Sequence, residues 1–474
     1  MDGIDVHRDA NASPVVTCGL YSWGAEKSFN SQPMNPTDQS SASSTSIDRD
    51  DAGVAASMRN RWLFLLPAVF VTYSLAYLDR ANFGFGAAAG MAATLHITGS
   101  QTSLLGSLFF LGYFAFQLPG AAVAKRVGVT RLVFVLLIAW GIFAALTGVI
   151  HVFWLLAIDR VLLGIAESLI FPAMVYLLSS WFTRAERSRA NAFLIIGNPG
   201  TVLWMSVVTG YLIQSFGWQK TFIIEGLPSI AWAVIWIAIV RDRPSQAHWM
   251  TPYAAQLLES ALAQEQVGIA SVGTVRKALV RPDVLLLSAQ YFFWSLGIYG
   301  FVLWLPTMVR QGAASTMGWT GILSAIPYFA AVLLMSLVAY VSDKTQRRQS
   351  LVWPFLLLAG IALLGSFLLA QRSFPMAFVC LVIGGACMYA PYGPFFAIIP
   401  ERLPRNVIPE VLALINSAGA LGGFVGTYFV GLLQALTGTS RAGFLLMSVA
   451  LFCSAILFLP MASKPPSENV GLPA

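Results

Sequence analysis

Long apolar segments are the feature that most limits what this chain can fold into. Twelve of them recur between residues 62 and 462. A helix of about 20 residues crosses the roughly 30 Å hydrocarbon core of a bilayer, whereas transmembrane barrels show short strands of alternating polarity. We therefore predict an all-α membrane protein with twelve transmembrane helices. The predicted spans are 62–86, 99–123, 131–150, 153–179, 189–213, 221–240, 284–308, 318–341, 350–370, 375–398, 406–433 and 441–462.

The composition agrees with a membrane protein and argues against several other classes. Hydrophobic residues make up 57% of the 474 residues and charged residues only 10%, against about 25% charged residues in an ordinary soluble domain. The four cysteines show no disulfide framework and the four histidines are isolated, so we expect no metal site and no cofactor. No span holds a nucleophile, a base and an orienting group together, so we do not expect an enzyme.

The positive charges indicate how the chain crosses the membrane. The net charge is +7, but the basic residues are spread over the loops rather than gathered as a nucleic-acid surface requires. The loops predicted on one side hold sixteen Lys and Arg residues, and those on the other side hold four. Because basic residues favour the cytoplasmic side, we predict cytoplasmic termini in a bacterial-type inner or plasma membrane.

Changes in polarity divide the chain into five parts. Residues 1–57 are rich in Ser, Asn and Asp, and we expect a disordered tail there. A polar linker at 241–282 separates a first bundle of six helices, residues 58–240, from a second bundle of six, residues 283–462. Residues 463–474 form a short C-terminal tail.

Four motifs give the sequence a family resemblance. They are LDRAN in the first span, RVLLGIAES (160–168) in the fourth, YGFVLWLP (299–306) in the seventh and INSAGALGGFVG (415–426) in the eleventh. On these motifs the chain resembles the major facilitator superfamily, and within it the anion:cation symporters of organic acids. The resemblance implies two six-helix bundles that give access to a central site from one side of the membrane and then from the other.

One loop departs from the family pattern. The loop after the second span usually carries an aspartate before its arginine, whereas this chain has Lys125 before Arg126. In the superfamily this loop acts as a conformational latch. We therefore expect the latch of this protein to rest on Asp343, Arg347 and Arg348, which follow the eighth span.

Charged residues inside the spans are the strongest functional signal. A charge near the bilayer centre costs about 2.5 to 3.5 kcal/mol, so such residues are seldom kept without a role. Asp79 and Arg80 lie in the first span, and Asp159, Arg160 and Glu167 lie in the fourth. Arg160 and Glu167 are seven residues apart, which places them on one helix face, separated by roughly 10 Å along the axis.

These charges favour an anionic substrate and proton coupling. Two guanidinium groups at a similar depth repel each other unless an anion lies between them, and their fork of donors fits a carboxylate. A buried carboxyl group near arginine is poised to exchange a proton when its surroundings change. Two structural alternatives remain open: Arg80 can extend its head group to the membrane surface, and Arg160 with Glu167 can form a pair that only holds helices together. For Asp159 the structural role is favoured.

The resemblance implies specific roles for these positions. Asp79 and Glu167 match proton-coupling acids of the family, while Arg80 and Arg160 match substrate-binding or gating arginines. The resemblance also places four polar side chains in the substrate cavity, namely Tyr77, Tyr113, Asn198 and Asn416.

Glycine and proline indicate breaks and close packing in three spans. GNPG (197–200) and APYGP (390–394) are expected to interrupt the fifth and tenth spans beside the cavity. Overlapping G-x-x-x-G spacings in the eleventh span, from Gly419 to Gly426, favour packing within the bundle over a dimer face.

We predict a monomeric secondary active transporter that imports a small organic anion with protons by alternating access. A sugar acid or related carboxylate is favoured, because tyrosines and amides of the uncharged second bundle suit hydroxyl groups. Transport of aromatic or dicarboxylic acids and export of hydrophobic compounds are the alternatives. A receptor that binds without transport is disfavoured, since the chain has no sizeable cytoplasmic domain.

Overall fold

The structure is a computed structural model that describes residues 40–266, 275–345, 347–402, 407–439 and 441–462. Every regular element in this part of the chain is a helix. The first group of helices is α1 (Ser40–Ala88), α2 (Met91–Thr94), α3 (Gly99–Val127), α4 (Val129–Thr147), α5 (Phe153–Ser168), α6 (Ile170–Trp181) and α7 (Arg184–Ile239). Short helices η1 (Pro244–Gln246), α8 (Pro252–Gln266) and α9 (Val275–Leu279) follow.

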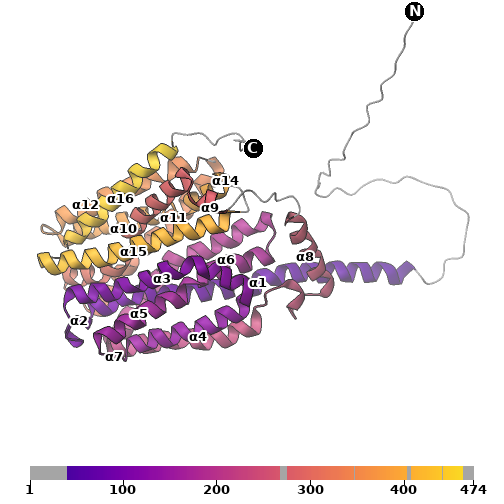
Figure 1. Ribbon diagram of the computed structural model, residues 1–474, viewed down its shortest axis with the longest axis horizontal. Helices are drawn as coiled ribbons and strands as arrows, with labels where there is room; N and C mark the ends of the chain where they lie inside the picture. Colours follow the sequence, from indigo (N-terminus) through magenta and orange to yellow (C-terminus); the bar gives the residue numbers. More distant parts are fainter. Residues whose placement is uncertain (1–39, 267–274, 346, 403–406, 440, 463–474) are drawn as a thin grey trace, which may run out of the picture. The chain divides into compact units, whose positions relative to one another are not determined.

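A second group of helices completes the chain. It consists of α10 (Pro282–Ala313), α11 (Met317–Thr345), η2 (Gln349–Leu351), α12 (Trp353–Leu369), α13 (Phe374–Tyr389), α14 (Tyr392–Arg402), α15 (Ile408–Thr437) and α16 (Arg441–Ala462). Figure 1 shows α15 and α3, from the two groups, running side by side.

The helices account for the twelve predicted spans. Ten described helices are long and apolar enough to cross a membrane. One of them, Arg189–Ile239, has 51 residues and contains Gly217 at φ 78°, a left-handed conformation that suits glycine and turns the chain between two spans. The 29-residue α3, which is not among the ten, is long enough to supply the remaining span. The predicted all-α architecture is confirmed.

Proline explains two of the helix breaks. The tenth span is divided into α13 and α14 at Pro391, within the predicted APYGP segment. The fourth span is divided at Leu169, between α5 and α6, three residues before Pro172, which has no N–H to donate to the Ser168 carbonyl. The predicted interruption at GNPG was wrong, because α7 continues through Pro199.

The predicted N-terminal tail begins with residues that lie outside the described part, 1–39. Residues 40–57, which we expected to belong to the tail, are helical and form the start of α1. Serine, alanine and charged residues fill this segment, and such residues continue a helix at small cost.

Glycines allow the two helix groups to approach closely. A methyl group at Gly84 of α1 would clash with the backbone carbonyl of Leu303 in α10, and one at Gly321 of α11 would clash with the carbonyl of Ser206 in α7. Gln214 of α7 also accepts a hydrogen bond from the Gly318 backbone N–H of α11, at 2.8 Å. These contacts seal the end of the helix groups at which α1 ends.

The glycines of α15 pack mainly within their own group. A methyl group at Gly422 or Gly426 would clash with backbone carbonyls of α10. Gly423 instead faces Phe110 of α3 as well as Tyr299 of α10. The expected packing within the bundle is therefore confirmed for the stretch from Gly419 to Gly426, in which Gly423 also serves the contact between the two groups.

Candidate functional site

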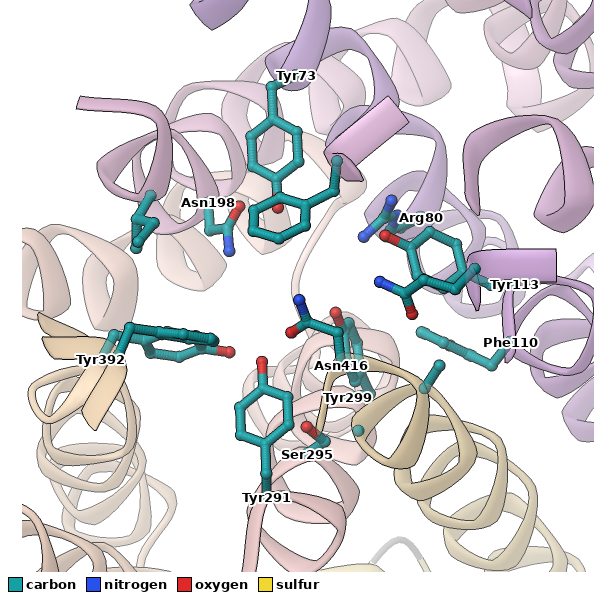
Figure 2. A pocket seen from close by; sticks show the side chains of 16 residues that line it. Tyr73, Arg80, Phe110, Tyr113, Asn198, Tyr291, Ser295, Tyr299, Tyr392 and Asn416 are labelled. Atoms are coloured by element: carbon teal, nitrogen blue, oxygen red, sulfur yellow. The ribbon is translucent and has the colours of Figure 1, made fainter. Parts of the chain in front are cut away.

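A cavity lies between the two helix groups. It is lined by Tyr73, Arg80, Phe110, Tyr113, Gln117, Phe171, Ile195 and Asn198 from the first group, and by Tyr291, Ser295, Tyr299, Tyr392, Phe396, Asn416, Gly419 and Ala420 from the second. Figure 2 shows the hydroxyl groups of Tyr73, Tyr291 and Tyr392 and the Asn198 amide directed into the same space. The lining is therefore aromatic with a few polar groups, and Arg80 is its one charged member.

Arg80 forms a buried ion pair with Glu167. The Arg80 Nε lies 2.9 Å from Glu167 Oε2, and the two side chains are 4% and 0% exposed. This pair joins α1 to α5 and rules out the alternative in which Arg80 extends to the membrane surface. It also shows that Glu167 pairs with the first span rather than with Arg160 on its own helix.

The guanidinium of Arg80 is held among aromatic rings. Its central carbon lies 4.5 Å from the ring centroid of Tyr113, 5.5 Å from that of Tyr77 and 5.6 Å from that of Phe109. Such contacts attract a cation without using its N–H donors. The Nη2 atom of Arg80 is buried and has no hydrogen-bond partner among the described residues, so a residue that lines the cavity carries an unused donor.

The second predicted arginine occupies a different position. Arg160 is buried, and its guanidinium lies over the rings of Phe83 and Phe109 at 4.7 and 5.5 Å. It does not line the cavity. Both arginines therefore contact the ring of Phe109.

A polar cluster lies behind the cavity wall. Asp79 is 1% exposed, and its Oδ1 accepts a hydrogen bond of 3.5 Å from the Asn82 amide. The same nitrogen donates to Glu225 Oε2 at 3.2 Å. Glu225 also accepts a hydrogen bond from the Thr209 hydroxyl. Asp79 and Glu167 are both buried and close to the cavity, but neither lines it.

The structure places three of the four polar side chains predicted for the cavity on its wall and one away from it. Tyr113, Asn198 and Asn416 line the cavity. Tyr77 does not line it and is 1% exposed, with its ring beside the Arg80 guanidinium. Asp159 accepts a hydrogen bond of 2.9 Å from Thr147 on α4, which agrees with the structural role favoured for it.

The residues predicted to form the latch lie at the end of α11. Arg348 donates from Nη1 to the Ala397 carbonyl of α14, at 3.3 Å. Arg347 is exposed, and the side chain of Asp343 lies outside the described part. In the first group, Asp242 accepts hydrogen bonds from the backbone N–H and the hydroxyl of Thr130, at 2.8 and 3.0 Å. An acidic residue after α7 therefore binds the start of α4, next to the loop that lacks the family aspartate.

Several residues of the site were missed at the level of sequence. Tyr73 lies one helical turn before Tyr77 on α1, and this spacing was a usable signal. Tyr392 and Phe396 reach the cavity because α14 starts a new helix after Pro391. Glu225 is the fifth residue of the predicted sixth span, so its position resembled that of a charged residue at the membrane surface.

Comparison with known proteins identifies the family. The sequence pattern of the Major Facilitator Superfamily matches residues 69–427 and 314–474. A protein named "Putative tartrate transporter" from Agrobacterium vitis is 30% identical, over 85% of this chain and 90% of the relative. A "Quinolone resistance transporter" from Acinetobacter baumannii is 29% identical, over 83% and 92% of the two chains.

A solved structure shares the fold. The crystal structure of a bacterial homolog to the human lysosomal transporter Spinster, in an inward-facing and unoccupied conformation, aligns with a TM-score of 0.65 and 19% identity. The alignment covers 84% of this chain and 95% of that one. The family pattern spans most of the chain, in agreement with the motifs in the first, fourth, seventh and eleventh spans. The chain therefore belongs to the Major Facilitator Superfamily of membrane transporters.

Proposed function

We propose that this protein is a secondary active transporter that imports a small organic anion, a sugar acid or related carboxylate, together with protons. The single observation behind this proposal is the arrangement of Arg80, which lines the cavity with a free Nη2 atom while its Nε is bound to the buried Glu167. The Arg80 guanidinium thus binds a titratable acid and also faces the cavity in which a ligand would bind. The relative named for tartrate, a hydroxylated organic acid, is consistent with this substrate class.

Substrate binding follows from the lining of the cavity. A carboxylate would accept hydrogen bonds from the guanidinium of Arg80, a geometry that arginine favours over lysine. The amides of Asn198 and Asn416 and the tyrosine hydroxyls would then meet the hydroxyl groups of the substrate. Because the two asparagines come from different helix groups, a substrate held by both would draw the groups together.

Proton coupling follows from the Arg80–Glu167 pair. When Glu167 takes up a proton it loses the charge that holds Arg80, and the guanidinium can give its full charge to the substrate carboxylate. When Glu167 loses the proton, it competes for Arg80 and weakens substrate binding. Protons and anions therefore favour each other's binding, which is the requirement for symport. Asp79, next to Arg80 in the chain, is proposed as a further proton site.

Alternating access is supported by the position of the seal. The contacts of Gly84 and Gly321 close the end of the helix groups at which α1 ends. With the proposed cytoplasmic termini, this end faces the outside, so the cavity would be closed to the outside in this conformation. We place the protein in a bacterial-type inner or plasma membrane as a monomer, with Asp343, Arg347 and Arg348 as latch residues at the cytoplasmic end.

Export of a hydrophobic or aromatic compound is the second candidate. The tyrosine and phenylalanine residues that line the cavity favour it, as does the relative named for quinolone resistance. The two candidates differ in their need for Arg80. An organic anion requires the guanidinium, whereas an apolar compound only requires the aromatic walls.

Uptake by proteoliposomes tests the proposal. Vesicles with purified protein and an alkaline interior would be given radiolabelled tartrate, hexuronates and aromatic acids at an acidic outer pH. We expect one of these acids to accumulate, and we expect Arg80→Ala to abolish its accumulation. Failure of all the acids, with transport of a quinolone that persists in Arg80→Ala, would favour the export function instead.

A further inference from the structure

A fourth buried carboxyl group, besides Asp79, Asp159 and Glu167, lies within the first helix group, and it has no role in the proposed cycle so far. Glu225, in the second half of α7, is 4% exposed. It lies eight residues after Gly217, at which the chain turns, and therefore about two helical turns inside the span. A carboxyl group at this depth is costly unless its surroundings compensate for it or it binds a proton.

The contacts of Glu225 are polar but not cationic. Asn82 donates to its Oε2 at 3.2 Å, and the Thr209 hydroxyl donates to its Oε1. No salt bridge to Glu225 is found among the described residues. A hydroxyl group can donate to a carboxylate and can also accept from a protonated carboxyl group. Thr209 can therefore serve Glu225 in both protonation states.

Asn82 links Glu225 to Asp79. One amide nitrogen donates to both carboxyl groups, at 3.2 Å to Glu225 and 3.5 Å to Asp79, so their oxygen atoms lie within a few ångströms of each other. Asp79 Oδ2 is buried and has no hydrogen-bond partner in the part of the chain that the structure describes. Two carboxyl groups this close do not readily ionise together, and one proton shared between them removes the repulsion.

The other charged groups near Asp79 and Glu225 lie on several helices. Those that act electrostatically on Asp79 are Arg80 on α1, Arg160 and Glu167 on α5, and Glu225 itself. Asp159 on α5 is held by Thr147. α4 packs against the same half of α7 at Gly141 and Gly226, and its one charged residue, Arg131, lies at the opposite end of the helix. Lys220, five residues before Glu225, is exposed.

We propose that Glu225 shares the coupling proton with Asp79, so that the two carboxyl groups, joined by Asn82, act as one proton-binding unit. The unit takes up a proton in one state of the transport cycle and releases it in the other, and only an O–H bond forms and breaks. This inference rests on the proposed symport and adds a residue to it. It gives Asp79 the neighbouring negative charge that favours proton binding despite the two arginines.

The test uses Glu225→Gln in proteoliposomes. Without the negative charge of Glu225, Asp79 is stabilised in its ionised form by the arginines and takes up a proton only at lower pH. We expect accumulation driven by a pH gradient near pH 7 to fall at least about tenfold, while substrate counterflow at equal pH stays within about twofold of the wild-type rate. Wild-type accumulation and an unchanged pH profile in Glu225→Gln would overturn the inference.

Two further variants keep the test decisive. Asp159→Asn is the matched control, since it neutralises another buried carboxyl group outside the pair and is expected to leave gradient-driven accumulation intact. Thr209→Val removes a donor to Glu225 but keeps the carboxyl group. It is expected to raise the pH of half-maximal uptake by about one unit, because the charge-assisted hydrogen bond that Thr209 donates to the ionised form is stronger than the bond it can form with the protonated form.

If Glu225→Gln also loses counterflow, Thr209→Val becomes the deciding variant. An unchanged dependence of uptake on pH in Thr209→Val would then contradict the inference. If wild-type uptake does not respond to a pH gradient at all, the proposed symport fails instead. If the gradient drives the wild type, and Asp79→Asn but not Glu225→Gln loses this response, only the shared proton is excluded.

Discussion

Arg80 and Glu167 meet at 2.9 Å between two helices, and only the arginine lines the cavity. The ion pair lies in the wall of the cavity rather than inside it. A ligand can therefore reach the guanidinium from one side while the carboxyl group holds it from the other. This relationship gives the proposed transport cycle a physical basis, because the charge of Glu167 sets how strongly Arg80 attracts an anion.

The geometry of the guanidinium is expected to matter as well as its charge. Arg80→Lys keeps the positive charge but has no fork of donors with which to bind Glu167 and a carboxylate together. Because a hydrogen bond to a charged group contributes about 1.5 to 3 kcal/mol, we expect substrate affinity to fall by about 10- to 100-fold. Binding of the transported acid to purified protein, measured by calorimetry, checks this. Affinity equal to that of the wild type would exclude a direct contact with Arg80.

The two asparagines of the cavity are expected to recognise hydroxyl groups. Asn198→Ala and Asn416→Ala each remove an amide that faces the cavity. If the substrate is a hydroxylated acid, each variant should raise KM by about 2- to 12-fold, as expected from the loss of a hydrogen bond of about 0.5 to 1.5 kcal/mol. The same variants should bind an analogue without hydroxyl groups as the wild type does. Equal losses for both ligands would assign the amides a role in shaping the cavity.

Close packing between α1 and α10 is expected to be needed for transport. A side chain at Gly84 meets the backbone of Leu303, which cannot move aside as a flexible side chain can. Gly84→Val should therefore disfavour the closed end and lower the transport rate by about 5- to 150-fold, since overpacking costs about 1 to 3 kcal/mol.

Gly200→Ala is the matched control for Gly84→Val. Nothing lies within 4 Å of a methyl group at Gly200. Labelling of a cysteine introduced at Ala88, which lies at the sealed end, reports how often that end opens. Labelling should increase in Gly84→Val and stay at the parental level in Gly200→Ala. Unchanged labelling in both variants would show that the seal does not depend on Gly84.

Much of the fold and part of the site could be predicted from the sequence, for clear physical reasons. The bilayer requires long apolar helices, so hydropathy alone indicates the spans. The cost of burying charge singles out Asp79, Arg80, Arg160 and Glu167, and the structure buries all four near one another. The sequence also places these residues on the first and fourth spans, because they fall within those predicted apolar segments.

The rest of the site depends on features that the sequence pattern does not specify. Helical spacing placed Arg160 and Glu167 on one face, but it could not show that Glu167 reaches across to Arg80 while Arg160 lies over Phe83. Glu225 was overlooked because a charge near the predicted end of a span resembles an interfacial residue. Its burial depends on the turn at Gly217, which sets where the second half of α7 begins.

Uptake driven by a pH gradient in the wild type and in Glu167→Gln tests the central claim most directly. The variant removes the charge that competes for Arg80 and also the proton-binding group. Accumulation of the organic acid in proteoliposomes should require the gradient in the wild type and should be lost in Glu167→Gln, while counterflow of the same acid continues. Gradient-driven accumulation that is equal in the two proteins would contradict the claim that Glu167 couples protons to the anion bound at Arg80.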